Sequence, residues 1–76
     1  MKYINFKYAG YVIFEETQNH KDIAKRFPTD EVISAGTIKL YPNGEENPLG
    51  TFGESTSLLK KSEVADADWI LRRLTN

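Results

Sequence analysis

The sequence predicts an α+β fold: an antiparallel sheet of about four strands in ββαββα order, with two helices packed on one face. Two observations lead to this prediction. A β-hairpin pattern followed by a helix pattern spans residues 2–27, and a second such pair spans residues 32–74. Both helix patterns are short, so each helix needs a sheet to pack against. A three-stranded sheet with an irregular fourth segment is the main alternative.

Length and composition limit what the chain can build. Its 76 residues predict a single domain over residues 1–76. A domain of this size buries only about 60% of the surface that its unfolded chain exposes, which makes a deep active-site cleft hard to form. The chain has no cysteine, so disulfides and thiolate metal sites are excluded. No metal-binding, cofactor-binding or catalytic motif stands out, and we assign none of these.

The charge balance disfavours several classes of partner. Ten Lys and Arg residues face eleven Asp and Glu residues, for a net charge of −1. A nucleic-acid-binding protein usually has a basic excess, and a mimic of DNA would have a strong acidic excess. The N-terminal residues alternate between polar and apolar, and no apolar run is long enough to span a bilayer. We therefore expect a cytoplasmic protein that binds neither nucleic acid nor membrane.

The first hairpin is predicted over residues 3–16, with a two-residue turn at Ala9-Gly10. That turn places Tyr8 opposite Tyr11. One face of the hairpin is then expected to be the core face and carries Ile4, Phe6, Tyr8, Tyr11 and Ile13. The opposite face is mixed, and its apolar residues are expected outside the core: Tyr3, Val12 and Phe14.

The first helix is expected to begin after Asn19, a good N-cap residue, and to end before Pro28. Its apolar face has the spacing i, i+3, i+4, i+7 that is typical of a helix, and it consists of His20, Ile23, Ala24 and Phe27.

The second half repeats the pattern. Residues 32–41 form the third strand, and its small residues Ser34 and Gly36 leave room for something large, most simply a helix. A turn at Pro42-Asn43-Gly44 and a polar loop lead to a fourth strand over residues 49–52. Residues 53–61 have no clear assignment. The last helix is expected to start at the N-cap Ser62, and its inner face consists of Val64, Ala67, Leu71 and Leu74, flanked by Ile70.

A small-ligand site is one interpretation of the polar residues. His20 is the only histidine, and the segment Gly53–Ser57 carries three hydroxyls that are able to surround a ligand. The segment lacks the lysine of a phosphate-binding Walker loop and the second glycine of a nucleophile elbow. A Ser55–His20 dyad oriented by Glu54 would need geometry that the sequence does not show. The structural interpretation is a histidine bonded to a backbone carbonyl and a loop tied by its own hydroxyls. The candidate ligand-binding residues are His20, Ser34, Ser55 and Ser57.

A protein-binding surface is the other interpretation. Apolar residues without an obvious place in the core often mark contacts, and they are Tyr3, Val12, Phe14 and Trp69. Trp69 lies near Arg72 and Arg73, and Trp and Arg are enriched where binding energy concentrates. The alternative is a tryptophan that covers the edge of the core. The partner would be another protein, or a second copy of the chain that buries the open hairpin face.

Several short segments resemble small uncharacterised proteins encoded by phages and prophages: residues 20–24, 33–36, 53–58, Ser62 and the acidic run 63–68. The resemblance implies no activity. It places the chain among accessory factors, some of which block host defence or host enzymes by binding. We therefore expect a non-enzymatic binding protein, with a small-ligand-binding domain or minimal enzyme as the alternative. Nucleic-acid binding through Lys60, Lys61, Arg72 and Arg73 is the least favoured function.

Overall fold

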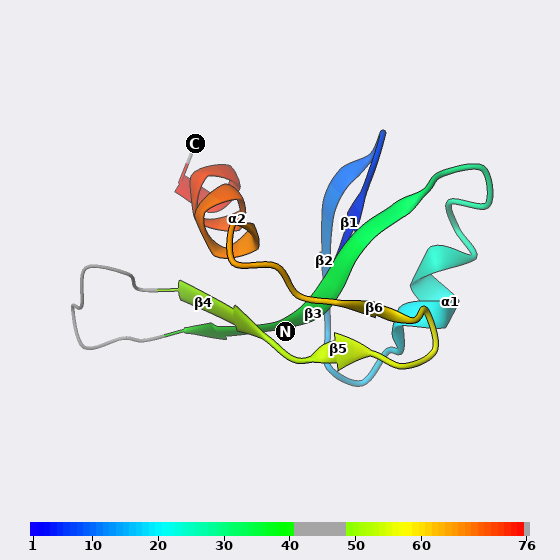
Figure 1. The fold of residues 1–76 in the computed structure, drawn as a ribbon, viewed down its shortest axis with the longest axis horizontal. Coiled ribbons are helices and arrows are strands. Elements are labelled where there is room, and N and C mark those ends of the chain that lie inside the picture. Colours follow the sequence, from blue (N-terminus) through cyan, green and yellow to red (C-terminus); the bar gives the residue numbers. More distant parts are fainter. Residues whose placement is uncertain (41–48, 76) are drawn as a thin grey trace.

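The fold is α+β, with a four-stranded antiparallel sheet, a small second hairpin and two helices (Figure 1). The computed structural model describes residues 1–40 and 49–75. Along the chain the elements are β1 (Lys2–Phe6), β2 (Gly10–Phe14), α1 (His20–Ala24), β3 (Val32–Leu40), β4 (Leu49–Phe52), β5 (Glu54–Ser55), β6 (Lys60–Lys61) and α2 (Asp66–Thr75). The predicted turn at Pro42-Asn43-Gly44 lies outside the described residues.

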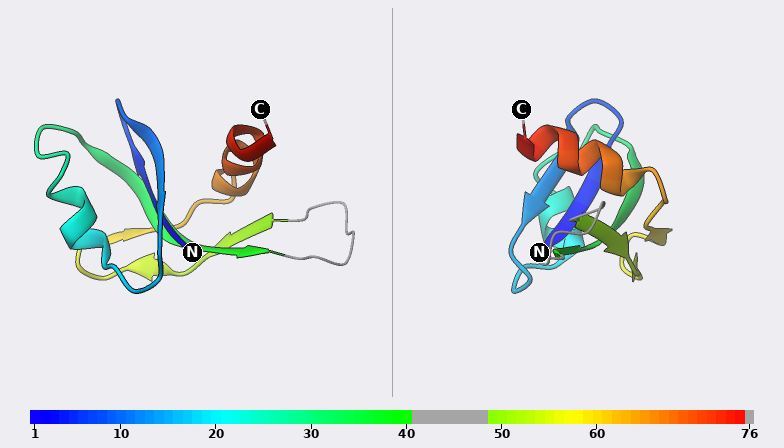
Figure 2. Two further views of the ribbon diagram at one scale, coloured as in Figure 1. Left: turned by 180° about the vertical axis from the view of Figure 1, so that it is seen from behind. Right: turned by 90° about the vertical axis from the view of Figure 1, so that its left-hand side faces the viewer.

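The sheet has the order β2-β1-β3-β4, and the long strand β3 is its central element. The first part of β3 pairs with β1, whereas its last part pairs with β4. Both neighbours meet at Thr37, which lies opposite Lys2 on one side and Phe52 on the other. The two parts of β3 thus lead to opposite ends of the molecule, with α1 at one end and α2 at the other (Figures 1 and 2).

The β1–β2 hairpin is present, but its predicted register is wrong. Phe6 lies opposite Gly10, so residues 7–9 form a three-residue loop instead of a turn at Ala9-Gly10. The carboxylate of Asp30 explains this loop, because it accepts hydrogen bonds from the backbone N–H groups of Tyr8 at 3.0 Å and Ala9 at 2.8 Å. Gly10 closes the loop with a φ of +80°, a conformation that favours glycine.

Both faces of the hairpin are buried, and each face carries its own helix. Neighbouring residues of a strand point to opposite faces. Ile4 packs in a cluster with Ile23 of α1, and its neighbour Tyr3 packs in a cluster with Ile70 of α2. The prediction that both helices pack on one face is therefore wrong: the sheet lies between them.

This arrangement corrects the expected surface of the hairpin. Tyr3 is 0% exposed and Phe14 is also buried, while Val12 is partly buried against the α1 cluster. Tyr8, expected in the core, is 77% exposed. The expectation that Tyr3, Val12 and Phe14 lie outside the core fails because it allowed the sheet only one buried face.

The start and the buried face of helix α1 agree with the prediction, whereas the helix ends at Ala24, earlier than the predicted end before Pro28. The side chain of Asn19 accepts a hydrogen bond from the backbone N–H of Asp22, which is the geometry of an N-cap. His20 and Ile23 are buried, and Ala24 and Phe27 pack partly buried against the same cluster.

The unassigned segment 53–61 forms the β5–β6 hairpin, which follows β4 directly. The backbone then crosses β3 closely at Gly36, where an added Cβ would lie 2.7 Å from the Phe52 carbonyl oxygen and 2.9 Å from Ser62 Cβ. Gly36 of β3 therefore makes room for this crossing rather than for a helix.

Helix α2 begins at Asp66, four residues beyond the predicted N-cap Ser62. The Asp66 carboxylate accepts a hydrogen bond from the N–H of Glu63 at 2.9 Å and so satisfies a donor at the start of the helix. Val64 precedes the helix and is fully exposed, so its predicted place on the inner face is wrong. Among the described residues, no helix is long and apolar enough to cross a membrane.

Candidate functional site: a polar groove beside His20

A groove of about 400 Å³ lies between the start of α1 and the β5–β6 loop. It brings together residues that are distant in the sequence, including His20 and the serines of segment 53–57. Its lining consists of Lys2, Asn19, His20, Lys21, Thr37, Glu54, Ser55, Thr56 and Ser57. The spatial condition for a ligand site that uses His20 and this loop is therefore met.

His20 forms the inner wall of the groove. Its Nε2 lies 3.1 Å from the Gly36 carbonyl oxygen, and its ring meets the Phe14 ring edge-on at a centroid distance of 5.3 Å. A carbonyl only accepts hydrogen bonds, so Nε2 carries a hydrogen and the neutral ring keeps Nδ1 as an acceptor. Burial lowers the pKa of His20 below its usual value; the hydrogen bond to Gly36 opposes this shift, and the charge of Lys2 adds to it.

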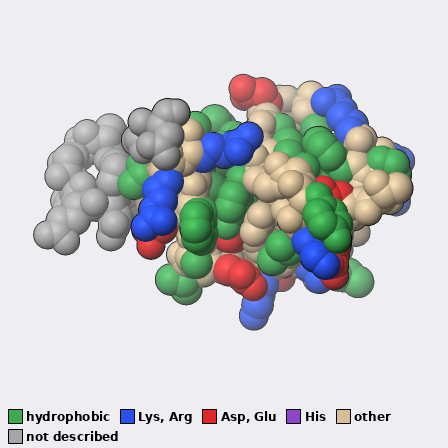
Figure 3. All heavy atoms as spheres, turned by 90° about the horizontal axis from the view of Figure 1, so that it is seen from above, with side chains coloured by type: hydrophobic (Ala, Val, Ile, Leu, Met, Phe, Trp, Pro, Cys, Tyr) green, Lys and Arg blue, Asp and Glu red, His purple; other side chains and the backbone are tan. Residues whose placement is uncertain are grey.

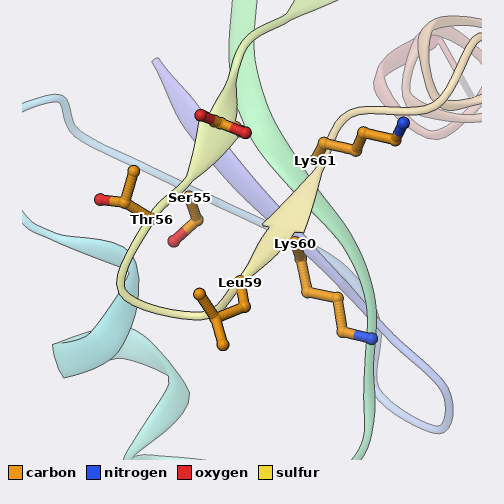
Figure 4. Close-up of a pocket in the computed structure, with 6 residues that line it drawn as sticks. Ser55, Thr56, Leu59, Lys60 and Lys61 are labelled. Carbon is orange, nitrogen blue, oxygen red and sulfur yellow. The ribbon is translucent and has the colours of Figure 1, made fainter.

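The opposite wall of the groove is rich in hydroxyl groups. Ser55 is buried, and its Oγ lies 3.3 Å from the Oγ of Ser57. Thr56 points away from β6, toward the side on which α1 lies (Figure 4). Ser34, the fourth candidate ligand residue, does not line the groove: it is fully buried in β3, and its Oγ has no hydrogen-bond partner. The groove thus unites three of the four predicted ligand residues.

The groove carries more donors than acceptors. Lys2 Nζ donates one hydrogen bond to the Gln18 carbonyl oxygen at 3.0 Å and keeps two further hydrogens. Lys21 is exposed, and within the described part of the chain neither lysine forms a salt bridge. The side-chain oxygen of Asn19 is occupied by the N-cap bond, which leaves its NH₂ group as a donor. Glu54 is the one carboxylate in the lining.

A catalytic dyad is not assembled in this groove. The Oγ of Ser55 pairs with Ser57, and the Nε2 of His20 pairs with a backbone carbonyl, so neither contacts the other. Within residues 1–40 and 49–75, no group of three or more His, Asp or Glu side chains is arranged to hold a metal ion.

A second feature is the outer stripe of α2, which we define as Asp68, Trp69, Arg72 and Arg73. These exposed residues follow the i, i+1, i+4, i+5 spacing of one helix face. Trp69 is 55% exposed, and the Arg72 guanidinium lies 5.1 Å from its ring centroid. Apolar side chains reach the surface among charges of both signs on the face seen from above, with no large region of one charge (Figure 3).

The inner side of α2 is fixed to the sheet by a buried hydrogen-bond network. The Asp66 carboxylate accepts hydrogen bonds from the hydroxyl of Tyr3 at 2.5 Å and that of Tyr11 at 2.8 Å. Burial raises the pKa of both tyrosine hydroxyls well above the usual value, and the hydrogen bond to Asp66 adds to this shift. Together with buried Ile70, this network holds the outer stripe in one orientation.

The tip of the β5–β6 hairpin offers a second, more open groove of about 370 Å³ (Figure 4). Leu59 at this tip is 89% exposed and has a φ of +57°, which is uncommon for a residue with a side chain. Lys60 and Lys61 point in different directions from β6, so they do not form a single basic cluster.

Sequence reasoning identified His20, Ser55 and Ser57 but missed Lys2, Lys21 and Thr37, which lie in other segments. No local signal marks these three residues as neighbours, because the β1–β3 pairing and the position of the β5–β6 hairpin bring them together. The comparisons add no assignment: no protein-family model, no curated protein and no solved structure matches the chain.

Proposed function

We propose that the protein is a non-enzymatic binding protein that acts by contact with another protein, through the outer stripe of α2. The observation that carries this proposal is Trp69: it is more than half exposed, stacked with Arg72, and held on a helix that Asp66 fixes to the sheet. Trp and Arg dominate the binding energy of many protein interfaces. A side chain held in place before binding also loses less conformational entropy when it binds.

The stripe indicates the chemistry of its partner. Trp69 needs an apolar recess, and Arg72 and Arg73 favour carboxylates at the rim of that recess. The hairpin face with Tyr3, Val12 and Phe14 is not part of this proposal, since those side chains are used inside the fold. A cytoplasmic location and a role as a phage or prophage accessory factor belong to the same proposal and agree with the resemblance of the sequence.

The experiment uses the single tryptophan of the chain as its probe. Proteins retained by the immobilised chain are identified from the source organism, and each purified candidate is titrated while Trp69 fluorescence is followed. We expect a blue shift of the wild-type emission on binding. Trp69→Ala has no tryptophan to report this shift, so it is titrated by calorimetry beside the wild type. We expect this variant to bind about 30-fold more weakly, the effect of losing about 2 kcal/mol. Leu59→Ser is the matched control, because it removes another exposed apolar side chain that lies on the β5–β6 hairpin and not on α2.

Two outcomes would contradict the proposal. The first is a partner that binds the Trp69→Ala variant as tightly as the wild type while losing affinity for Leu59→Ser. The second is a blue shift that depends only on the concentration of the chain itself, accompanied by a dimer in sedimentation, since the partner would then be a second copy.

A further inference from the structure

The groove beside His20 carries an inference separate from the α2 stripe. We propose that it is a binding site for a small oxyanion, a phosphate or carboxylate group carried by a small molecule, held by Lys2, Lys21 and the hydroxyls of Thr56 and Ser57. A volume of about 400 Å³ admits a small molecule of this kind.

The donor balance of the lining selects an anion over a neutral ligand. Neither lysine forms a salt bridge in the described part of the chain, although the charge of Lys2 also acts on the exposed Glu16 carboxyl, and Asn19 has only its NH₂ group left. Every oxygen of a phosphate or carboxylate accepts hydrogen bonds, and bonds in which the acceptor is charged are about twice as strong as neutral ones. Glu54 is the one negatively charged residue of the lining, so the two lysines outnumber it and the lining has a net positive charge.

The hydroxyl wall complements the lysines. One hydroxyl of the Ser55–Ser57 pair donates to the other, so the pair keeps one hydrogen for a ligand. Thr56 points to the side on which α1 lies (Figure 4). Asn19 and Lys21 belong to the same lining, so a ligand in the groove meets hydroxyl donors together with amine and amide donors.

His20 gives the site a fixed inner wall. Its Nε2–H is directed to the Gly36 carbonyl, and Phe14 packs against its ring, so the ring is held in one orientation. The lining of the groove therefore includes a ring whose orientation is fixed by contacts inside the fold.

The test is a titration of ¹⁵N-labelled protein with inorganic phosphate, glycerol phosphate and citrate, and with glycerol as the neutral probe. We expect saturable shifts of the backbone signals of Lys21, Thr37 and residues 54–57 with at least one anion, and none with glycerol. Glycerol phosphate separates an organic phosphate from the inorganic ion, and citrate separates a carboxylate from a phosphate.

Variants locate the site. Lys21→Gln and Thr56→Val should each weaken anion binding about tenfold, the effect of losing one charge-assisted hydrogen bond. Lys25→Gln is the matched control: it removes the same charge one turn further along α1, outside the groove. All three residues are exposed, so the variants should fold, and the amide spectrum of each verifies this.

The proposal is overturned by any of three results. The first is an absence of saturable shifts up to about 10 mM of every anion, a range that covers weak millimolar binding. The second is that glycerol binds as tightly as the anions. The third is that Lys25→Gln weakens anion binding as much as Lys21→Gln does, which would show a diffuse electrostatic effect. The anion site is tested independently of the α2 stripe, because the two sites share no residue. A result that contradicts the proposed role of Trp69 therefore does not decide whether the groove binds an anion.

Discussion

Removing the hydroxyl of Tyr3 tests the network that fixes α2 to the sheet. In the Tyr3→Phe variant the ring still fills its place in the core, but the Asp66 carboxylate loses the hydrogen bond from the Tyr3 hydroxyl, at 2.5 Å. Asp66 keeps the bonds from Tyr11 and from the N–H of Glu63. The change therefore removes one interaction and leaves the shape of the core intact.

The expected cost follows from the charge and burial of that bond. A hydrogen bond to a charged group contributes about 1.5–3 kcal/mol, and here both partners are almost completely buried. With a urea slope of about 1 kcal/mol per M for a small domain, the unfolding midpoint should fall by about 2 M. Trp69 fluorescence and far-UV circular dichroism report the transition. Tyr8→Phe is the matched control, because Tyr8 is mostly exposed and its loss should cost less than about 0.5 kcal/mol.

Alkaline pH provides a second measurement of the same network. The fold raises the pKa of Tyr3 and Tyr11, so both stay protonated in the folded chain while the unfolded chain ionises them near the ordinary value of 10.0. The stabilisation is thus fully present below pH 10 and is lost as the pH rises above it, by about 1.4 kcal/mol per pH unit for each tyrosine. Tyr3 and Tyr11 together cause part of the decrease in the free energy of unfolding with pH, and Tyr3→Phe should halve that part. Tyr8→Phe should leave the decrease unchanged.

A specific result would refute this reasoning. If Tyr3→Phe shifts the urea midpoint no more than Tyr8→Phe and leaves the alkaline slope unchanged, the Asp66 network does not hold α2 in place. The argument that Trp69 is presented in a fixed orientation would then fail as well.

Three further predictions follow from the packing of β3 and α1. Gly36→Ala should destabilise the fold by about 1–3 kcal/mol, since its methyl group would lie 2.7 Å from a backbone oxygen; thermal unfolding measures this, and an unchanged midpoint would contradict the crossing at Ser62. Ser34→Ala should be neutral or stabilising by up to about 1 kcal/mol, because it removes a buried hydroxyl without a partner; a clear loss in urea unfolding would show that the hydroxyl is bonded. His20 has a lowered pKa, so its contribution is present above the ordinary pKa of 6.5 and is lost as the pH falls below it. The free energy of unfolding should therefore decrease from pH 7 to pH 5 in the wild type, and less in His20→Gln; equal slopes would contradict the burial of the ring.

The sequence predicted the elements better than their arrangement. The bounds of β4 and the start of α1 agree with the structure because local signals determine them: Pro48 before a short β-rich run, and the side chain of Asn19 as N-cap. The hairpin register was wrong because the loop conformation depends on Asp30, more than twenty residues away from Tyr8 and Ala9. No local pattern contains such information.

The number of buried faces was the larger error, and it decided the site predictions. An alternating strand with one polar face predicts one buried face, but β1 and β2 carry apolar residues on both sides. Tyr3, Val12 and Phe14 looked unexplained because only one face of the sheet was expected to be buried. In the structure Tyr3 packs on the side of α2, whereas Val12 and Phe14 pack on the side of α1. Their burial removes the hairpin as a docking surface in the folded chain.

That same burial strengthens the case for Trp69. The side of the sheet that carries Tyr3 is covered by α2, and the buried Asp66 lies one helical turn before Ile70, so the inner face of the helix is fully used. Trp69 is next to Ile70 in sequence and therefore points about 100° away from it around the helix axis. A large apolar ring in this position cannot reach the core without rotating the helix, which would break the bonds from both tyrosines to Asp66. The exposure of Trp69 is thus a consequence of the network, and a partner that covers this side chain gains apolar burial that the fold itself does not provide.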